Sequence, residues 1–295
     1  GDVVEILGWE HEDARWTLRH TGSHVLAQAV KRLYPETKLA IGPAIENGFY
    51  YDFDREKPFL QEDLDKIEAE MKKIVKEGLR LERFELPRAE AIAFMTERDE
   101  PYKVQLIEEL PADAVISFYR QGEFVDLCAG PHLFSTGAVK AYKLTQCTGA
   151  YWKGDQKNKM LQRVYGTAFP SKDELKAHLH MIQEAMERDH KKIGAQLDLF
   201  MFDETAPGMP YWLPRGWKMY QALLKYSREV QERHGYTEIA APLVNNKKLW
   251  LISGHWAHYV NNMFIIPGKD GTIEADDTMA AKPMNCPNAM MAYKR

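Results

Sequence analysis

The chain has 295 residues, of which 45% are hydrophobic and 28% charged, and its formal net charge is -4. At about 100–200 residues per domain, this length allows two domains. No apolar run approaches the roughly 20 residues that a membrane span needs, which argues against a membrane protein. Cys128, Cys147 and Cys286 lie far apart and form no CxxC pair. This cysteine usage argues against a disulfide framework and predicts a cytoplasmic protein.

Basic residues gather between positions 138 and 192, where 11 Lys or Arg stand against 6 Asp or Glu, although the chain as a whole is acidic. A basic segment on an acidic protein is a candidate phosphate-contacting surface. On charge alone, a solvated helix surface explains the segment as well, so both interpretations stay open.

The first part of the chain predicts mixed helices and strands. Pro35 ends a first helix that Asp13 caps, Asn47-Gly48 predicts a hairpin, and Gly78 suits a helix C-terminus. The predicted elements, in chain order, are a helix at 13–34, a hairpin at 40–54, helices at 61–77, 88–98 and 102–110, paired strands at 115–119 and 123–127, and strands at 139–146 and 160–165.

A capping box marks the connector to a second region. Ser171 and Glu174 have the spacing of such a box, and they predict a helix that reaches about residue 193. Beyond it we predict a helix at 216–234, a strand at 236–244, a helix at 247–253, a hairpin around 269–271 and a helix beginning near 287. We expect this second region to be the opening part of a larger domain.

Two short motifs carry the candidate chemistry. His20 and His24 lie four residues apart on a predicted helix and therefore share one face. The turn at Gly130-Pro131, just after a predicted strand, can aim Cys128 and His132 at one point. Three histidines and one cysteine are also a zinc-ligand set. Structural histidines, a zinc site, and a metal-free pocket in which a polarised water attacks an activated ester all remain open.

Several motifs, in order, resemble those of bacterial threonyl-tRNA synthetases. The matching stretches are His20–His24, Ala40–Asp52, Asp126–His132, Gly149–Asp155, Asn158–Gly166, Arg188–Gly194, Ala206–Met209 and Lys282–Pro287. The resemblance covers essentially the whole chain, and a related domain occurs in alanyl-tRNA synthetases and their free-standing deacylase relatives. It implies an α+β fold with an editing domain at 1–170, a linker helix at 171–195 and the N-terminal portion of a class II catalytic domain at 196–295.

The resemblance also implies the activity and its partners. The intact enzyme is expected to join threonine to tRNA(Thr) with ATP and Mg, and the editing domain to hydrolyse seryl-tRNA(Thr). Such an editing site is needed because serine lacks one methyl group of threonine, a difference worth only about 1–3 kcal/mol in a binding pocket. We expect the remaining ATP-binding motifs to lie beyond Arg295, so that this chain alone would only edit.

The family's editing pocket implies seven residues here. His20, His24, Cys128, His132 and Lys103 are the expected catalytic set, and Tyr51 and Asp126 the expected substrate-binding residues. We expect His20 and Lys103 to position or deprotonate water, His24 and His132 to hold the terminal adenosine, and Cys128 and Asp126 to bind the amino group and hydroxyl. In the alanyl relatives the His/His/Cys/His set holds zinc, but by resemblance to the threonyl family we expect no metal in this pocket.

The second region resembles the start of a class II catalytic domain. The stretch from His234 to Val244 resembles the first class II motif, which implies a homodimer in the intact enzyme through Pro242. Cys286 matches the family's first catalytic zinc ligand, although we expect it to hold no zinc tightly by itself because structural and catalytic zinc sites use at least three protein ligands.

Three other functions stay open. A stand-alone trans-editing deacylase would not need residues 200–295, and a non-catalytic tRNA-binding paralogue would be expected to lack at least one of the seven pocket residues. A zinc-stabilised structural module would contain stoichiometric metal.

Overall fold

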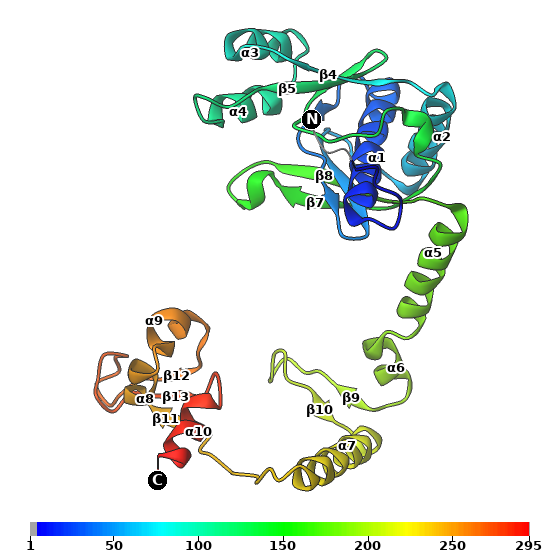
Figure 1. Cartoon of the computed structure of the whole chain (residues 1–295). Coiled ribbons are helices and arrows are strands. Elements are labelled where there is room, and N and C mark those ends of the chain that lie inside the picture. The colour runs from blue at the N-terminus through cyan, green and yellow to red at the C-terminus, as the bar shows by residue number, and fades with distance from the viewer. Residues whose placement is uncertain (1–4, 295) are drawn as a thin grey trace. The chain divides into compact units, whose positions relative to one another are not determined.

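The computed structural model describes residues 5–294, and the chain divides into two units, Gly1–Arg188 and Asp189–Arg295 (Figure 1). Helices and antiparallel sheets occur in both units. The predicted α+β class is therefore confirmed. Among the described residues, no helix has the length and apolar character that crossing a membrane requires.

A five-stranded antiparallel sheet forms the larger layer of the first unit, in the order β1-β3-β8-β7 with β2 paired to β3. Its strands are β1 (Lys38–Leu39), β2 (Ala44–Ile45), β3 (Gly48–Asp54), β7 (Ala141–Tyr151) and β8 (Met160–Phe169). Helix α1 (Glu12–Leu33) packs on β3 and β8, and α2 (Gln61–Glu77) packs on α1 and β7. The aromatic side chains of β3 fill the core between sheet and helices.

A smaller layer of the same unit holds a second sheet. Its strands, in the order β4-β5-β6, are β4 (Leu81–Glu85), β5 (Ser117–Gln121) and β6 (Phe124–Leu127), and its helices are α3 (Arg88–Glu97) and α4 (Pro101–Glu109). Short 3-10 turns η1 (Thr136–Ala138) and η2 (Trp152–Gly154) flank β7. Phe118 and Met95 lie in a separate hydrophobic core under α3 and α4. The first unit thus has two larger cores and a small third cluster at Ala40, Trp152 and Leu161, and α1 reaches both layers.

One arginine joins three elements of the first unit. Arg32, near the end of α1, contacts Glu77 of α2 at 2.7 Å, Glu70 of α2 at 3.3 Å and Glu123, just before β6, at 2.7 Å. Its hydrogen bond to Glu123 is the main cause that lowers the pKa of that carboxyl to about 2. Because ion pairs that form a network gain more than isolated ones, Arg32 holds α1, α2 and the turn before β6 together.

Apart from the long helix α7, the second unit is built from short elements. Its elements are α6 (His190–Gln196), β9 (Phe200–Met201), β10 (Tyr211–Trp212), α7 (Pro214–Arg233), β11 (Val244–Asn246), α8 (Lys247–Ile252), α9 (His255–Tyr259), η3 (Val260–Asn262), β12 (Ile265–Ile266), β13 (Met279–Ala281) and α10 (Cys286–Tyr293). Strand β9 pairs with β10, and β13 lies between β11 and β12. A Cβ at Gly216 would lie 1.9 Å from the Leu199 carbonyl oxygen, so only glycine fits where α7 begins.

Most predicted elements of the first unit are confirmed. The helix predicted at 61–77 has those bounds, and Gly78 ends it with a φ of 65°. The hairpin at Asn47-Gly48 and the paired strands across Gly122 are also present. Helix α1 begins one residue earlier than predicted, because the side chain of His11, rather than that of Asp13, provides its N-cap.

Three predicted elements of the later chain differ from the structure. The helix predicted to run to about 193 ends with α5 (Lys172–Glu187), and Asp189 then starts α6 by accepting the backbone N–H groups of Lys191 and Lys192. The strand predicted at 236–244 is wrong: it pairs only from Val244 onward, since residues 236–243 have no neighbouring strand. The turn near Gly271 exists, but it lies within a long loop between β12 and β13 rather than in a tight hairpin.

The packing of α2 gives a first prediction. Met71 is fully buried between α2 and the sheet, whereas Met181 on α5 is 56% exposed. We expect Met71→Ala to lower the free energy of unfolding by about 2–5 kcal/mol, because it leaves a cavity. Met181→Ala is the matched control and should change it by less than about 0.5 kcal/mol. Urea denaturation of both variants measures the difference, and equal effects would contradict the packing described.

Candidate functional site

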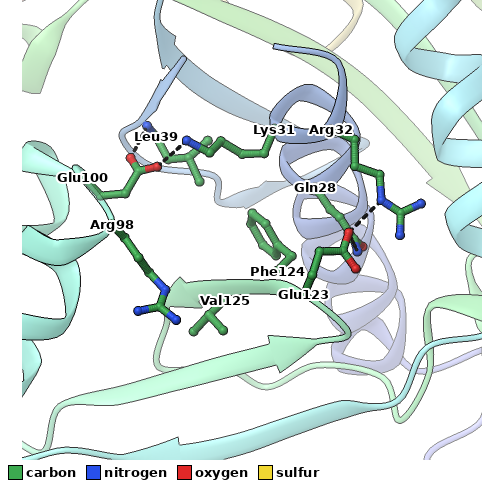
Figure 2. Close-up of a pocket in the computed structure, with 9 residues that line it drawn as sticks. All are labelled: Gln28, Lys31, Arg32, Leu39, Arg98, Glu100, Glu123, Phe124 and Val125. Atoms are coloured by element: carbon green, nitrogen blue, oxygen red, sulfur yellow. Dashed lines mark hydrogen bonds and ion pairs between the residues drawn. The ribbon is translucent and has the colours of Figure 1, made fainter. Parts of the chain in front are cut away.

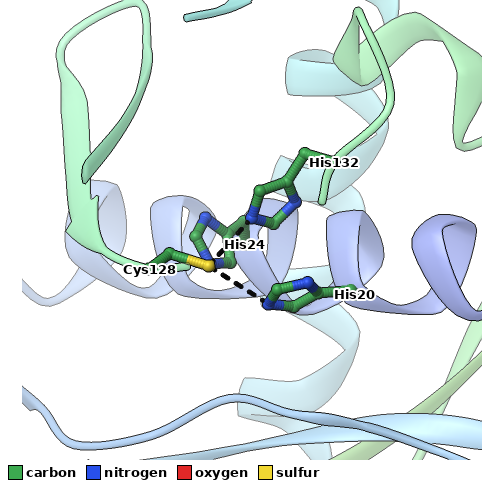
Figure 3. A group of neighbouring side chains, drawn as sticks. All are labelled: His20, His24, Cys128 and His132. Atoms are coloured by element: carbon green, nitrogen blue, oxygen red, sulfur yellow. Dashed lines mark hydrogen bonds between the residues drawn. The ribbon is translucent and has the colours of Figure 1, made fainter. Parts of the chain in front are cut away.

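Helix α1 contributes two imidazoles to one point of the first unit. His20 and His24 lie one turn apart, with ring centroids 5.3 Å from each other. The helix is buried from Thr21 to Val30 because it passes between the two sheet layers. The His20 and His24 side chains are therefore held on the side of α1 that meets the strand end of β6 (Figure 3).

The segment after β6 brings Cys128 and His132 to the same point. The Cys128 N–H donates to the Ser117 carbonyl oxygen at 3.0 Å, which fixes the end of the strand. Gly130 has a φ of 80°, and a Cβ there would lie 2.3 Å from the Tyr119 hydroxyl. Only glycine can therefore make this turn, and the chain returns His132 toward α1.

The four side chains converge on the Cys128 sulfur. Cys128 Sγ lies 3.3 Å from His20 Nε2 and 3.2 Å from His132 Nε2 (Figure 3). One potential ligand atom from each of His20, His24, Cys128 and His132 lies within 4.8 Å of the others. The convergence that the sequence predicts for these two motifs is thus present.

A buried ion pair stands next to the cluster. Lys103 Nζ lies 2.6 Å from Asp126 Oδ1, and both side chains are almost completely buried. Lys103 also donates to the Tyr51 hydroxyl at 2.9 Å, and that hydroxyl donates to Asp126 Oδ2 at 2.5 Å. His24 Nε2 is 3.7 Å from the same Asp126 oxygen, so Asp126 lies beside the histidine cluster.

Burial makes the pocket electrically neutral apart from that ion pair. It lowers the pKa of His20, and it lowers the pKa of His24 and His132 well below the usual range. The Pro131 carbonyl and the Asp126 charge act in the opposite direction on His20. Burial also raises the pKa of the Cys128 thiol to about 12. At neutral pH the pocket therefore contains neutral imidazoles and an uncharged thiol.

Two residues that the sequence motifs do not single out, Thr21 and Tyr119, also contact the cluster. The Thr21 hydroxyl lies 3.2 Å from His132 Nδ1, and the Tyr119 ring packs edge-on against the His132 ring at 4.5 Å. Thr21 lies inside the HxxxH motif, but its contact with a residue 111 positions away follows only from the tertiary structure. Cys286, by contrast, lies exposed in the second unit, and among residues 5–294 no group of three potential metal ligands includes it.

The cluster fits a zinc ion by chemistry and spacing. Zn–N bonds of about 2.0–2.1 Å and Zn–S bonds of about 2.3 Å place ligands on tetrahedral zinc roughly 3.3–3.6 Å apart. The two distances to Cys128 Sγ are close to that range. His20 and His132 also have outer hydrogen bonds at Nδ1, as zinc-bound histidines usually do. His20, His24, Cys128 and His132 are thus the residues that would hold a metal.

A separate cavity of about 280 Å³ lies further along α1, between Lys31, Glu100 and Phe124 (Figure 2). Lys31 Nζ is 2.9 Å from Glu100 Oε1, and Arg32 is 2.7 Å from Glu123. Glu100 further accepts the Leu39 N–H at 2.7 Å. Because these charges already have partners within the protein, we regard the cavity as a structural space between the two layers.

Comparisons with known proteins cover both the segment that begins at β5 and the chain as a whole. The family described as "Threonyl and Alanyl tRNA synthetase second additional domain" matches residues 116–165, which include Asp126, Cys128 and His132. The chain is 57% identical to the threonine–tRNA ligase of Clostridium acetobutylicum over 291 residues, and 58% identical to that of Acetivibrio thermocellus over 293 residues. Each alignment covers 99% of this chain and 45% of the relative.

The predicted resemblance to threonyl-tRNA synthetases is confirmed. The chain spans about half the length of the curated threonine–tRNA ligases that it matches. A solved RNA binding domain of threonyl-tRNA synthetase from Cryptosporidium parvum Iowa II matches 36% of this chain and 26% of its own, with 35% identity and a TM-score of 0.33. At that TM-score the match adds nothing to the fold assignment.

The raised pKa of Cys128 predicts how the thiol reacts. Only the thiolate is nucleophilic, so alkylation of Cys128 by iodoacetamide should stay slow from about pH 7 to about pH 9 and increase toward pH 12. The exposed Cys286 is the internal control and should react first. Mass spectrometry of the digested protein measures both. Equally fast labelling of Cys128 at neutral pH would mean that its thiol is ionised in the pocket.

The buried ion pair predicts the stability of the first unit. We expect Asp126→Asn to lower the free energy of unfolding by about 3–5 kcal/mol, because it leaves the Lys103 charge buried and unpaired. Asp99→Asn, which removes the more exposed ion pair with Lys38, should cost less than about 1 kcal/mol. The double variant Lys103→Met/Asp126→Asn should recover stability relative to Asp126→Asn. Chemical denaturation of the three variants tests this, and a double variant no more stable than Asp126→Asn would contradict it.

Proposed function

We propose that the first unit is the editing domain of a threonyl-tRNA synthetase and that it hydrolyses seryl-tRNA(Thr). The observation that carries the proposal is the pocket in which His20, Cys128 and His132 meet beside the buried Lys103–Asp126 pair. Part of this pocket lies in the segment that matches the additional domain of threonyl and alanyl tRNA synthetases. The similarity to threonine–tRNA ligases extends through the second unit, which supports this function over a stand-alone deacylase.

His20 is the proposed base that takes a proton from the attacking water. Its imidazole is neutral at physiological pH, so Nε2 can accept that proton. A general base works best when its pKa is near the operating pH. Burial lowers the pKa of His20 less than that of His24, and hydrogen bonding to Pro131 counteracts the shift. His20 is therefore a stronger base than His24.

Lys103 is the proposed cationic group for the developing negative charge on the ester. Two contacts of its ammonium group go to Asp126 and Tyr51, and an ammonium has three N–H donors. The remaining donor is available to an ester oxygen or to water. Asp126 keeps the cation in this buried position, because a buried charge without a partner is strongly unfavourable. Tyr51 and Asp126 in this way orient Lys103 as well as line the pocket.

Cys128 is proposed to bind the substrate rather than to attack it. The aminoacyl ester is already activated, so no covalent step is required, and a thiol with a pKa of about 12 is a poor nucleophile at neutral pH. His24 and His132 are proposed to shape the pocket and to hold the terminal adenosine. In this proposal the same side chains leave room for serine but not for the extra methyl group of threonine.

The proposal extends to an intact enzyme of the length of the matched ligases, about half of which this chain spans. That protein would ligate threonine to tRNA(Thr) with ATP and Mg in the cytoplasm. It would form a homodimer through the segment around Pro242. Cys286 would be a zinc ligand there, together with residues outside this chain.

We propose that the editing reaction proceeds without metal, through the side chains described. A zinc ion held by His20, His24, Cys128 and His132 is the competing possibility, and it would supply a Lewis acid to the bound water. Elemental analysis of the purified protein and activity after treatment with a chelator separate the two. Loss of activity with a chelator and recovery with zinc would replace the metal-free proposal.

Deacylation assays test the proposed function. The chain should hydrolyse Ser-tRNA(Thr) and spare Thr-tRNA(Thr). We expect His20→Ala to reduce the rate by about 10²–10⁴-fold, the usual contribution of a general base. His180→Ala, an exposed histidine on α5, is the matched control and should leave the rate unchanged. Cys128→Ser should reduce the rate far less than His20→Ala.

Lys103 requires a control for folding, since its substitution leaves Asp126 unpaired. Lys103→Met/Asp126→Asn should be folded and slow by about 10²–10⁴-fold. Hydrolysis of both aminoacyl-tRNAs at the same rate would contradict the editing assignment. A trapped acyl-enzyme on Cys128 would contradict the water mechanism.

A further inference from the structure

The hydroxyl of Thr21 has a complete set of hydrogen-bond partners. Its oxygen lies 2.8 Å from the Thr17 carbonyl oxygen, 3.0 Å from the Leu133 N–H group and 3.2 Å from His132 Nδ1. A threonine hydroxyl offers one proton and two lone pairs. A carbonyl oxygen can only accept and an N–H can only donate, so two of the three roles are determined at once.

These three hydrogen bonds determine which ring nitrogen of His132 carries the proton. The hydroxyl proton must point to the Thr17 carbonyl, because two oxygens 2.8 Å apart without a proton between them would repel each other. One lone pair accepts the Leu133 N–H, and the remaining lone pair faces His132 Nδ1. Nδ1 must therefore donate. In a neutral imidazole that carries its proton on Nδ1, the other nitrogen, Nε2, has a free lone pair.

His20 has the same Nδ1–H tautomer, although a different hydrogen bond determines it. Its Nδ1 lies 3.1 Å from the Pro131 carbonyl oxygen, which can only accept, so Nδ1 carries the proton. Its Nε2 lone pair then faces Cys128 Sγ at 3.3 Å, while that of His132 faces the same sulfur at 3.2 Å. One thiol has one proton, and it can satisfy only one of these two lone pairs at a time.

We propose that Thr21 is a positioning residue that holds His132 in its Nδ1–H tautomer, so that the pocket presents an unsatisfied acceptor to a substrate N–H group. The chemical class of group that fits is a protonated amine, since it brings several donors and a positive charge to the lone pair that the thiol proton leaves without a partner. The α-ammonium group of an aminoacyl ester is such a group. The binding role rests on the proposed function, whereas the tautomer follows from the geometry alone.

Histidine tautomers are directly measurable in the full chain by two-bond ¹H–¹⁵N correlation spectra of ¹⁵N-histidine-labelled protein. The signal of His132 is assigned by its loss in His132→Gln. We expect the Nδ1–H form in the wild type. Thr21→Val keeps the shape of the side chain but removes the acceptor, so it should raise the fraction of the Nε2–H form. Thr21→Ser keeps the hydroxyl and should retain the wild-type tautomer.

The same variants also allow a test by activity. Loss of one hydrogen bond corresponds to a factor of up to about tenfold, so Thr21→Val should slow Ser-tRNA(Thr) deacylation by about that factor, mainly through KM. Thr21→Ser should recover most of the rate. Thr17→Val is the matched control, because its hydroxyl also bonds to a carbonyl one turn back on α1, that of Asp13, but does not touch the pocket.

The spectra and the deacylation assay together distinguish a failure of the Thr21 proposal from a failure of the proposed function. An Nε2–H form of His132 in the wild type, or an unchanged tautomer in Thr21→Val, would overturn the proposal whatever the activity. Equal slowing in Thr21→Ser and Thr21→Val would show that the hydroxyl is not the cause, and would also overturn it. A wild-type chain that spares every seryl ester would refute the proposed function, and the spectra would still decide the role of Thr21.

Discussion

The ion pair between Lys103 and Asp126 is removed almost completely from water, and the arrangement of the first unit depends on it. Two charges in such a place are tolerated only when they meet each other and when their remaining donors and acceptors have partners. Tyr51 supplies those partners from the large sheet, while Lys103 comes from α4 and Asp126 from β6. The pair therefore sets how closely the small layer approaches the large one, and with it the width of the pocket beside it.

Helix α1 is the element along which the two layers meet. Its residues from His20 to Arg32 face, in turn, the turn after β6, the buried pair, the small sheet and the acidic residues of α2. The side-chain amide of Gln28 links α1 to the small layer, because it forms hydrogen bonds with Gln121 of β5 and with Glu123. A helix that is polar along one buried stripe is costly unless each group has a partner. Partners come from both layers, although the buried His24 Nδ1 has none among the described residues, so the pocket and the interface between the layers are one structure.

Much of the pocket was predictable from local sequence, and its chemistry was not. The spacing of His20 and His24 places them on one helix face, and the turn at Gly130-Pro131 predicts the return of His132. Taken alone, Lys103 on a predicted helix suggests a solvated charge. Its burial is explained only by the ion pair with Asp126, which is distant in sequence. Strand β4 was missed because its buried Leu81 and half-buried Phe84 lie three apart instead of alternating. The strand predicted at 236–244 pairs only from Val244 onward, because a strand also needs a neighbour to satisfy its backbone groups.

Two imidazole lone pairs and one thiol proton meet at the Cys128 sulfur. This imbalance affects how the pocket would treat a substrate whose amino group has been acylated. An amine that has been formylated or joined to a peptide has lost its positive charge and all but one of its N–H groups. It would bring bulk to the pocket without the donors that the imidazoles lack. A pocket with this proton inventory would therefore discriminate between a free aminoacyl ester and one whose nitrogen is already in an amide bond.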